Sequence, residues 1–296
     1  MTAAGGGLLA VLLLAAPVSA QDARTAPEGN LVQKIETGLR YAEGPAWSRE
    51  GFLIFSDVAG DRLLKLVPGS RAVTYREAAG GPSGNAFDSQ GRLYTCETRN
   101  RRVVRYERGK PVVLAESWEG KRLNAPNDIV VRKDGHAWFT DPAFGYQSDA
   151  RELDFYGVFH ITPKRELKLT AKTEGRPNGI ALSPNGRILY VIDSDGREVR
   201  AWDVDGRGET SKERVVVSGI EGVPGGIRAA EDGNLYVTVE SGIAVYTPQG
   251  KPVGTINVAE PSSNCAFGDA DGKTLYITAG ASVYRFRLDG QGAESH

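Results

Sequence analysis

Six polar or small residues recur at one position of a repeated pattern, each of them eight residues before a turn glycine. They are Glu43, Ser83, Asn127, Asn178, Gly225 and Asn264, and the glycines are Gly51, Gly91, Gly135, Gly186, Gly233 and Gly272. Carboxylate and amide oxygens are the ligands that hard cations such as Ca²⁺ take in proteins. If the fold gathers these positions into a ring, Glu43, Asn127 and Asn178 are candidate metal ligands. Asn127 is also a candidate substrate-binding residue. The alternative is that Asn and Gly merely suit the turns at which strands begin.

A second set of acidic residues follows the same glycines by six or seven positions. Its members are Asp57, Glu97, Asp141, Asp193 and Glu240. A strand that returns antiparallel would bring them to the same face as the first set, as an acidic layer around the ring. Asp141 precedes a long aromatic loop, so we take it as the candidate catalytic base or orienting group. The alternative is that these acids cap the amides of loops.

The elements that must position these residues are short strands in repeats of about forty residues. The turn glycines are 40, 44, 51, 47 and 39 residues apart, which is the spacing of propeller blades with about four strands each. Asp-Gly, Asn-Gly and Gln-Gly pairs suit tight hairpins, and the chain beyond residue 20 shows no sustained helical periodicity. We therefore predict an all-β, six-bladed β-propeller with four-stranded blades. A β-sandwich would not explain six copies in register.

Ring closure would join the two ends of the chain. We expect residues 31–35 to add a strand beside residues 283–288 of the last blade, because a blade cannot bury both of its faces alone.

The first twenty residues have the pattern of a signal peptide. An apolar run at residues 7–17 precedes the small residues Val18-Ser19-Ala20, and it is too short for a bilayer core of about 30 Å. We predict a signal peptide over 1–20, one propeller domain over 21–296, and a periplasmic or secreted protein. A disordered or tail-anchoring N-terminus is the alternative.

The composition narrows the class of partner. A net charge of −1 over 296 residues gives no reason to expect nucleic acid or an anionic membrane. We expect a small-molecule substrate, no membrane span, and a monomer or weak dimer. Cys96 and Cys265 fall in different blades and are expected to be free, buried thiols. His136 and His160 are expected on the surface or in packing, not in a zinc site.

Four segments together resemble the senescence marker protein, gluconolactonase and luciferin-regenerating family. They are Tyr-Ala-Glu-Gly-Pro-Ala-Trp (41–47), a third-blade segment with Ala-Pro-Asn-Asp and Thr-Asp-Pro (125–142), Arg-Pro-Asn-Gly-Ile-Ala-Leu-Ser-Pro (176–184) and Asn-Cys-Ala-Phe-Gly (264–268). The resemblance implies a six-bladed propeller that holds one divalent cation in its channel, usually Ca²⁺, with Zn²⁺, Mn²⁺ or Fe²⁺ as other candidates. It implies hydrolysis, most often of sugar lactones. It also implies that Glu43 and Asn178 are metal ligands and that Asn127 lies near metal and substrate.

The fifth blade departs from the family pattern. Relatives typically have Pro-Asp-Gly there, and their Asp is both a metal ligand and the proposed base, whereas this chain reads Pro224-Gly225-Gly226. Glu43, Asp141 or Asp193 would then have to accept the proton. We predict an exported, divalent-metal-dependent lactonase in which metal-bound water attacks the lactone in the channel. The alternatives are a non-catalytic propeller that binds a sugar or protein, and a hydrolase of phosphoester or organophosphorus substrates.

Overall fold

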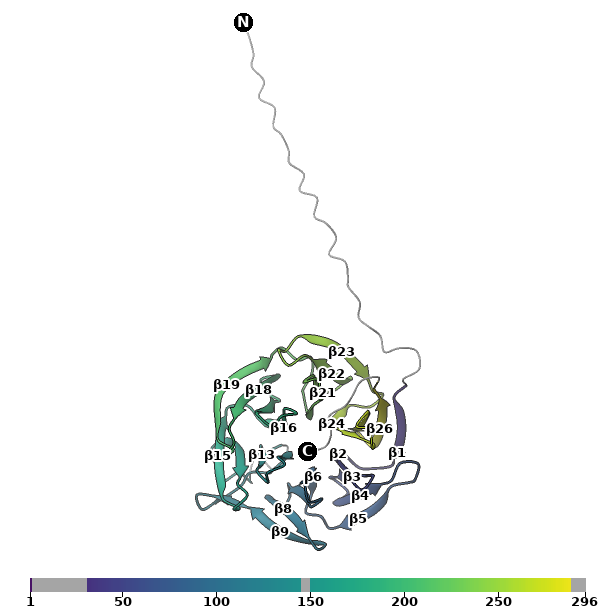
Figure 1. The fold of residues 1–296 in the computed structure, drawn as a ribbon, viewed down its shortest axis with the longest axis vertical. Coiled ribbons are helices and arrows are strands. Elements are labelled where there is room, and N and C mark those ends of the chain that lie inside the picture. The colour runs from purple at the N-terminus through teal and green to yellow at the C-terminus, as the bar shows by residue number, and fades with distance from the viewer. Residues whose placement is uncertain (2–30, 145–149, 289–296) are drawn as a thin grey trace.

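The computed structural model describes Met1, residues 31–144 and residues 150–288. Residues 2–20 of the predicted signal peptide lie outside this part of the chain. The described strands form six antiparallel four-stranded sheets arranged around an axis, as Figure 1 shows. The predicted six-bladed β-propeller is confirmed.

Each blade begins on the axis and ends at the rim (Figure 1). The innermost strands are β2 (Ala42–Ser48), β6 (Pro82–Phe87), β12 (Ile129–Val131), β16 (Pro177–Leu182), β20 (Ile227–Ala229) and β24 (Ser262–Gly268). The second strands are β3 (Phe52–Asp57), β7 (Leu93–Glu97), β13 (Ala137–Asp141), β17 (Ile188–Asp193), β21 (Leu235–Val239) and β25 (Thr274–Ala279). The third strands are β4 (Arg62–Leu66), β8 (Arg102–Glu107), β14 (Tyr156–Ile161), β18 (Glu198–Val204), β22 (Gly242–Tyr246) and β26 (Ser282–Arg287). The rim strands are β5 (Val73–Glu77), β9 (Lys110–Ala115), β15 (Leu167–Thr173), β19 (Thr210–Val217), β23 (Pro252–Asn257) and β1 (Gln33–Thr37). A small hairpin, β10 (Ser117–Trp118) with β11 (Lys121–Arg122), lies outside the blades.

The last blade contains both ends of the propeller. Strand β1 pairs antiparallel with β26, with Gln33 opposite Arg285 and Thr37 opposite Ser282. The predicted closure is confirmed, and the strand lies two residues further along the chain than expected. Pairing an N-terminal strand with a C-terminal one leaves no open blade at the junction.

The apolar core is divided among the boundaries between blades. One buried cluster joins Phe52 and Ile54 of the first blade to Leu93 and Val104 of the second, and each of the other five boundaries has such a cluster. A blade therefore buries its faces only against its neighbours, and stability depends on completing the ring.

The remaining sequence-based expectations about packing also hold. Cys96 and Cys265 are buried and free. His136 and His160 are buried and form a pair, with Nδ1 of His136 2.7 Å from Nε2 of His160, and both rings stack against Trp138.

No helix among the described residues is long and apolar enough to cross a membrane.

We predict that removing β1 destabilises the whole propeller. A chain that starts at Leu39, and so lacks residues 21–38, should melt at least about 10 °C lower than the chain that starts at Gln21, since it loses the β26 pairing and opens the ring. Thermal unfolding followed by circular dichroism measures this. A chain that lacks only residues 21–30 keeps β1 and is the control; equal melting temperatures for the two truncations would refute the closure role.

Candidate functional site

The inner strands approach one another closely where they begin. A Cβ on Gly44 would lie 2.0 Å from the carbonyl oxygen of Ser83, and Gly44 has a φ of +51° that glycine adopts most readily. Hydrogen bonds join neighbouring blades here, from Gly84 N to Asn127 O at 2.7 Å and from Gly179 N to Gly225 O at 2.9 Å. Glycine at the position of Gly44 in four of the six repeats permits the contact, which gathers the six strand starts around one opening.

A cavity of about 480 Å³ lies at this end of the channel, and we call it the polar cavity because carboxylate, amide and hydroxyl side chains are part of its lining. Its described lining consists of Tyr41, Glu43, Val58, Ser83, Thr98, Asn127, Phe144, Asn178, Val223, Pro224, Gly225, Ser262 and Ser263. Five of the six predicted ring positions are therefore together. The sixth blade contributes Ser262 and Ser263 in place of Asn264.

Irregular pairing explains how these side chains reach the cavity. The register between first and second strands shifts after Glu43 in the first blade and after Pro177 in the fourth. A third shift, between Ser262 and Asn264, accounts for the exchange of residues in the sixth blade. Such bulges re-aim side chains out of the regular alternation.

Glu43 supplies the carboxylate among the described residues that line the cavity. It is 7% exposed, and its Oε2 accepts a hydrogen bond of 2.6 Å from the amide of Gly44. The side chain of Asn264 interacts with this carboxylate and favours its charged form. Burial, reinforced by the charge of Asp128, raises the pKa of Glu43 to about 7. The buried carboxylate is thus short of positive charge.

The two asparagines present free amide oxygens. Nδ2 of Asn178 donates to Oγ of Ser194 at 3.1 Å, and Ser194 is itself fixed by donating to Pro224 O at 2.7 Å. This leaves Oδ1 of Asn178 without a hydrogen bond to any described residue. The side chain of Asn127 likewise has no hydrogen bond within the described chain, so both residues have oxygen atoms available.

This set of donors fits a hard divalent cation. One carboxylate and two neutral amide oxygens suit Ca²⁺, which completes its shell with water or substrate oxygens. Two hydroxyls of the lining are engaged, since Thr98 donates to Pro126 O and Ser263 donates to Ala42 O. Oγ of Ser262 has no hydrogen-bond partner among the described residues and is a further oxygen at the cavity. The described residues contain no cluster of three His, Cys, Asp or Glu that could hold a metal. The described residues therefore form no such cluster for a softer metal, and the fit to a hard cation depends on the carboxylate and the two amide oxygens.

Gly225 closes the position where relatives typically have an acid. A Cβ on Gly225 would lie 2.6 Å from Ser263 O and 2.9 Å from Oγ1 of Thr238. Backbone bonds fix the glycine, because Gly225 N donates to Thr238 O and Gly225 O accepts from Gly179 N. Restoring an aspartate would require the backbone to move, so this cavity is built around a small residue.

The prediction that Asp141 acts in the cavity is not supported by its position. Its Oδ2 accepts from Asn124 N at 2.7 Å and its Oδ1 accepts from Ala125 N at 2.8 Å. Asp141 is fully buried and is not part of the described lining. Both oxygens are used to hold the turn that leads to Asn127, which makes Asp141 a positioning residue. The pKa of Asp141 is nevertheless raised to about 7 by burial.

Three of the five acids that were expected in a layer around the mouth, Asp57, Asp141 and Asp193, hold loop amides instead. Asp57 accepts from the amides of Arg40 and Tyr41, two and three residues before Glu43, just as Asp141 does before Asn127. Asp193 accepts from Gly196 N. These acids therefore cap the amides of loops, as the alternative to an acidic layer predicted.

Two charged residues on the axis were missed by the sequence analysis. Asp128 is completely buried; it accepts from Ile180 N at 3.2 Å and lies 3.4 Å from Nη1 of Arg228. The repeats contain a signal for both. Asp128 occupies the place that four other repeats give to glycine, and Arg228 stands where the others have Ala, Val or Phe.

Comparison with known proteins agrees with this architecture. The family model described as the SMP-30/gluconolactonase/LRE-like region matches residues 41–281. The chain belongs to this family. A gluconolactonase of Zymomonas mobilis is 30% identical over 289 residues, which cover 86% of this chain and 81% of that protein.

Solved structures of family members have the same fold. A gluconolactonase of Xanthomonas campestris is 31% identical, with a TM-score of 0.82 over 88% of this chain and 90% of that one. A calcium-binding protein, regucalcin, of Agrobacterium tumefaciens has a TM-score of 0.74 over 90% of this chain and 97% of that one. At 17% identity, the second likeness concerns the fold alone.

We predict that Glu43→Gln stabilises the cation-free protein at pH 8. The folded protein keeps a proton on Glu43 up to a pH of about 7, whereas the ordinary value is 4.5. The folded state therefore binds more protons in this interval, and the contribution of Glu43 to stability falls as pH rises through it. Glutamine removes the buried charge, so the melting temperature in EDTA should rise by roughly 2–6 °C at pH 8.

The same pair of proteins at pH 5 is the control. Glu43 is protonated there in the folded state, and the gain should shrink to near zero. A variant that is no more stable than the wild type at pH 8 would show that the carboxylate is compensated within the protein.

Proposed function

We propose that this protein is a divalent-cation-dependent lactonase that opens a sugar lactone in the polar cavity of its channel. Membership of the family and the gluconolactonase relatives support a lactonase-type hydrolase acting on a small-molecule lactone. The observation that carries the proposal is the convergence of Glu43, Asn127 and Asn178, with free oxygens, on one cavity. We favour Ca²⁺ because all three donors are hard oxygens.

Each polar residue of the cavity would have its own role in the reaction. Glu43 and Asn178 would hold the cation, with Asn127 between cation and substrate. A bound cation would polarise the lactone carbonyl and increase the acidity of water. Glu43 is the carboxylate among the described lining residues, so its carboxylate would accept the proton of the attacking water. Cleavage of the ring C–O bond then returns a proton to the leaving oxygen, and the product is a hydroxy acid.

The rim of the cavity is suited to covering a ring. Tyr41, Val58, Phe144 and Val223 are apolar or aromatic residues of the lining. The guanidinium of Arg176 lies 4.9 Å from the centre of the Phe144 ring. Arg176 also forms an ion pair with Asp195, so the residue that packs on Phe144 is itself held in place. An apolar rim over a polar floor excludes water from the carbonyl while oxygens below hold the polar groups.

Two other functions fit the cavity less well. No Arg or Lys is among the described lining residues, so the cavity has no side-chain cation to pair with a charged phosphoester. A non-catalytic sugar- or protein-binding propeller is favoured by Gly225, which removes one acid from the site. Turnover separates this alternative from the lactonase.

We predict lactone hydrolysis that depends on cation and on Glu43. The mature protein should hydrolyse at least one member of a panel of aldono-lactones when Ca²⁺, Zn²⁺, Mn²⁺ or Fe²⁺ is supplied, with release of acid as the readout. Glu43→Gln should reduce kcat/KM by about 100-fold or more, and Asn127→Ala should mainly raise KM.

Asp141→Asn is the control for this experiment. It should lower the melting temperature, since one carboxylate oxygen is replaced by an amide nitrogen that cannot accept from the loop, while the chemistry of Glu43 persists. Cation binding without hydrolysis of any lactone would favour the binding propeller, and a Glu43→Gln protein as active as the wild type would refute the mechanism.

We also propose that the protein is exported. The support is the apolar run and the small residues before Gln21. Expression of the full chain in a Gram-negative host should give a periplasmic protein that begins at Gln21, as mass spectrometry of that fraction would show. A cytoplasmic protein that keeps residues 1–20 would overturn the proposal.

A further inference from the structure

A second, smaller chamber lies deeper along the same channel, toward the turn glycines. It has a volume of about 100 Å³. Its lining is made by inner-strand residues that follow the polar ring by two to four positions, including Trp47, Phe87, Val130, Leu182, Arg228 and Phe267. These walls are apolar in nearly every blade. Arg228 is the charged side chain among the described lining residues.

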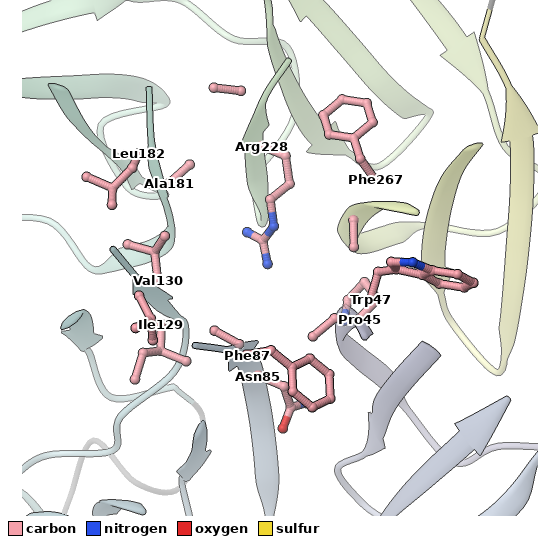
Figure 2. Close-up of a pocket in the computed structure, with 15 residues that line it drawn as sticks. Pro45, Trp47, Asn85, Phe87, Ile129, Val130, Ala181, Leu182, Arg228 and Phe267 are labelled. Carbon is pink, nitrogen blue, oxygen red and sulfur yellow. The ribbon is translucent and has the colours of Figure 1, made fainter. Parts of the chain in front are cut away.

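The guanidinium of Arg228 extends from β20 into the open centre of this chamber, as Figure 2 shows. All its hydrogen bonds within the described chain use Nη1, which donates to Ile227 O at 2.6 Å, to Ile180 O at 3.4 Å and to Asp128 at 3.4 Å. Nε and Nη2 have no partner among the described residues, and neither is among the buried unpaired atoms. These two nitrogens therefore face the chamber.

Nε and Nη2 form the edge of the guanidinium that a carboxylate binds with two parallel hydrogen bonds. Such a pair is favoured where apolar walls lower the effective dielectric constant. The contact with Asp128 is long and uses one nitrogen. A guanidinium present only to neutralise Asp128 would have no reason to leave its forked edge open to a cavity.

The charge and shape of the chamber select the ligand class. One guanidinium matches one negative charge, and Asp128 with Glu43 nearby opposes a dianion such as phosphate. The aromatic and aliphatic walls favour a short apolar tail over a polyhydroxylated chain. We propose that this chamber binds a small monocarboxylate with an apolar tail, held by its carboxylate on Arg228. This site is separate from the polar cavity and does not depend on the proposed lactonase activity.

Calorimetric titration of the mature protein tests the proposal. Hexanoate should bind with a one-to-one stoichiometry, at least about tenfold more tightly than hexanamide, because the charged pair is lost in the amide. Inorganic phosphate should neither bind nor compete. Equal affinity for hexanoate and hexanamide, or competition by phosphate, would overturn the assignment.

Two further variants test the site without leaving the charge of Asp128 or Arg228 buried alone. Asp128→Asn with Arg228→Met removes both charges together, so that neither is left buried alone, and it should abolish hexanoate binding. Ala86→Leu places a larger side chain on the chamber wall and should weaken binding while leaving Arg228 in place. Hexanoate binding that survives in both folded variants would refute this site.

The Glu43→Gln protein separates this inference from the proposed function. It should bind hexanoate at least as tightly as the wild type does, because a nearby negative charge is removed, even though it should not hydrolyse lactones. Loss of hexanoate binding in Glu43→Gln alone would show that the carboxylate binds in the polar cavity and would overturn the proposal.

Discussion

The close approach of the inner strands is the constraint on which the other features depend. Glycines such as Gly44 and Gly179 allow the backbone of one blade to lie against the next, and amide-to-carbonyl bonds between blades fix that contact. A larger side chain at these positions would push the blades apart. The radius of the channel, and with it the distance between polar side chains from different blades, is therefore set by a few small residues.

That narrow axis also decides the electrostatics of the molecule. Several buried polar groups near the strand starts are satisfied by neighbours within and between blades. Glu43 is held by Gly44 and Asn264, and Asp128 is held by Ile180 and Arg228. The first arrangement leaves a carboxylate short of positive charge, which suits a cation. The second leaves part of a guanidinium without a partner, which suits an anion. Two sites of opposite preference thus lie along one channel.

The acids at the ends of the second strands hold the loops that feed this axis. Asp57 and Asp141 accept backbone amides at matching positions before Glu43 and Asn127. In both cases the acid and the ring residue belong to the same blade, so the loop that leads to the ring residue is held from within that blade. Ring closure by β1 then fixes the positions of all six relative to one another.

The sequence by itself determined the architecture and most of the polar ring. Six repeats with turn glycines in register specify the blade, and the position eight residues earlier predicted that Glu43, Asn127 and Asn178 would meet. That inference succeeds because strand pairing is periodic, so equivalent positions in each repeat lie at equivalent places around the axis. Only the tertiary structure decided the features that depart from the regular repeat. The shifts in register near Asn264, the use of Asp141 by a loop, the closed position at Gly225 and the pairing of Asp128 with Arg228 all depend on contacts between segments distant in sequence. Local pattern cannot show such contacts, because burial and the choice of hydrogen-bond partner are fixed only when neighbouring blades pack together.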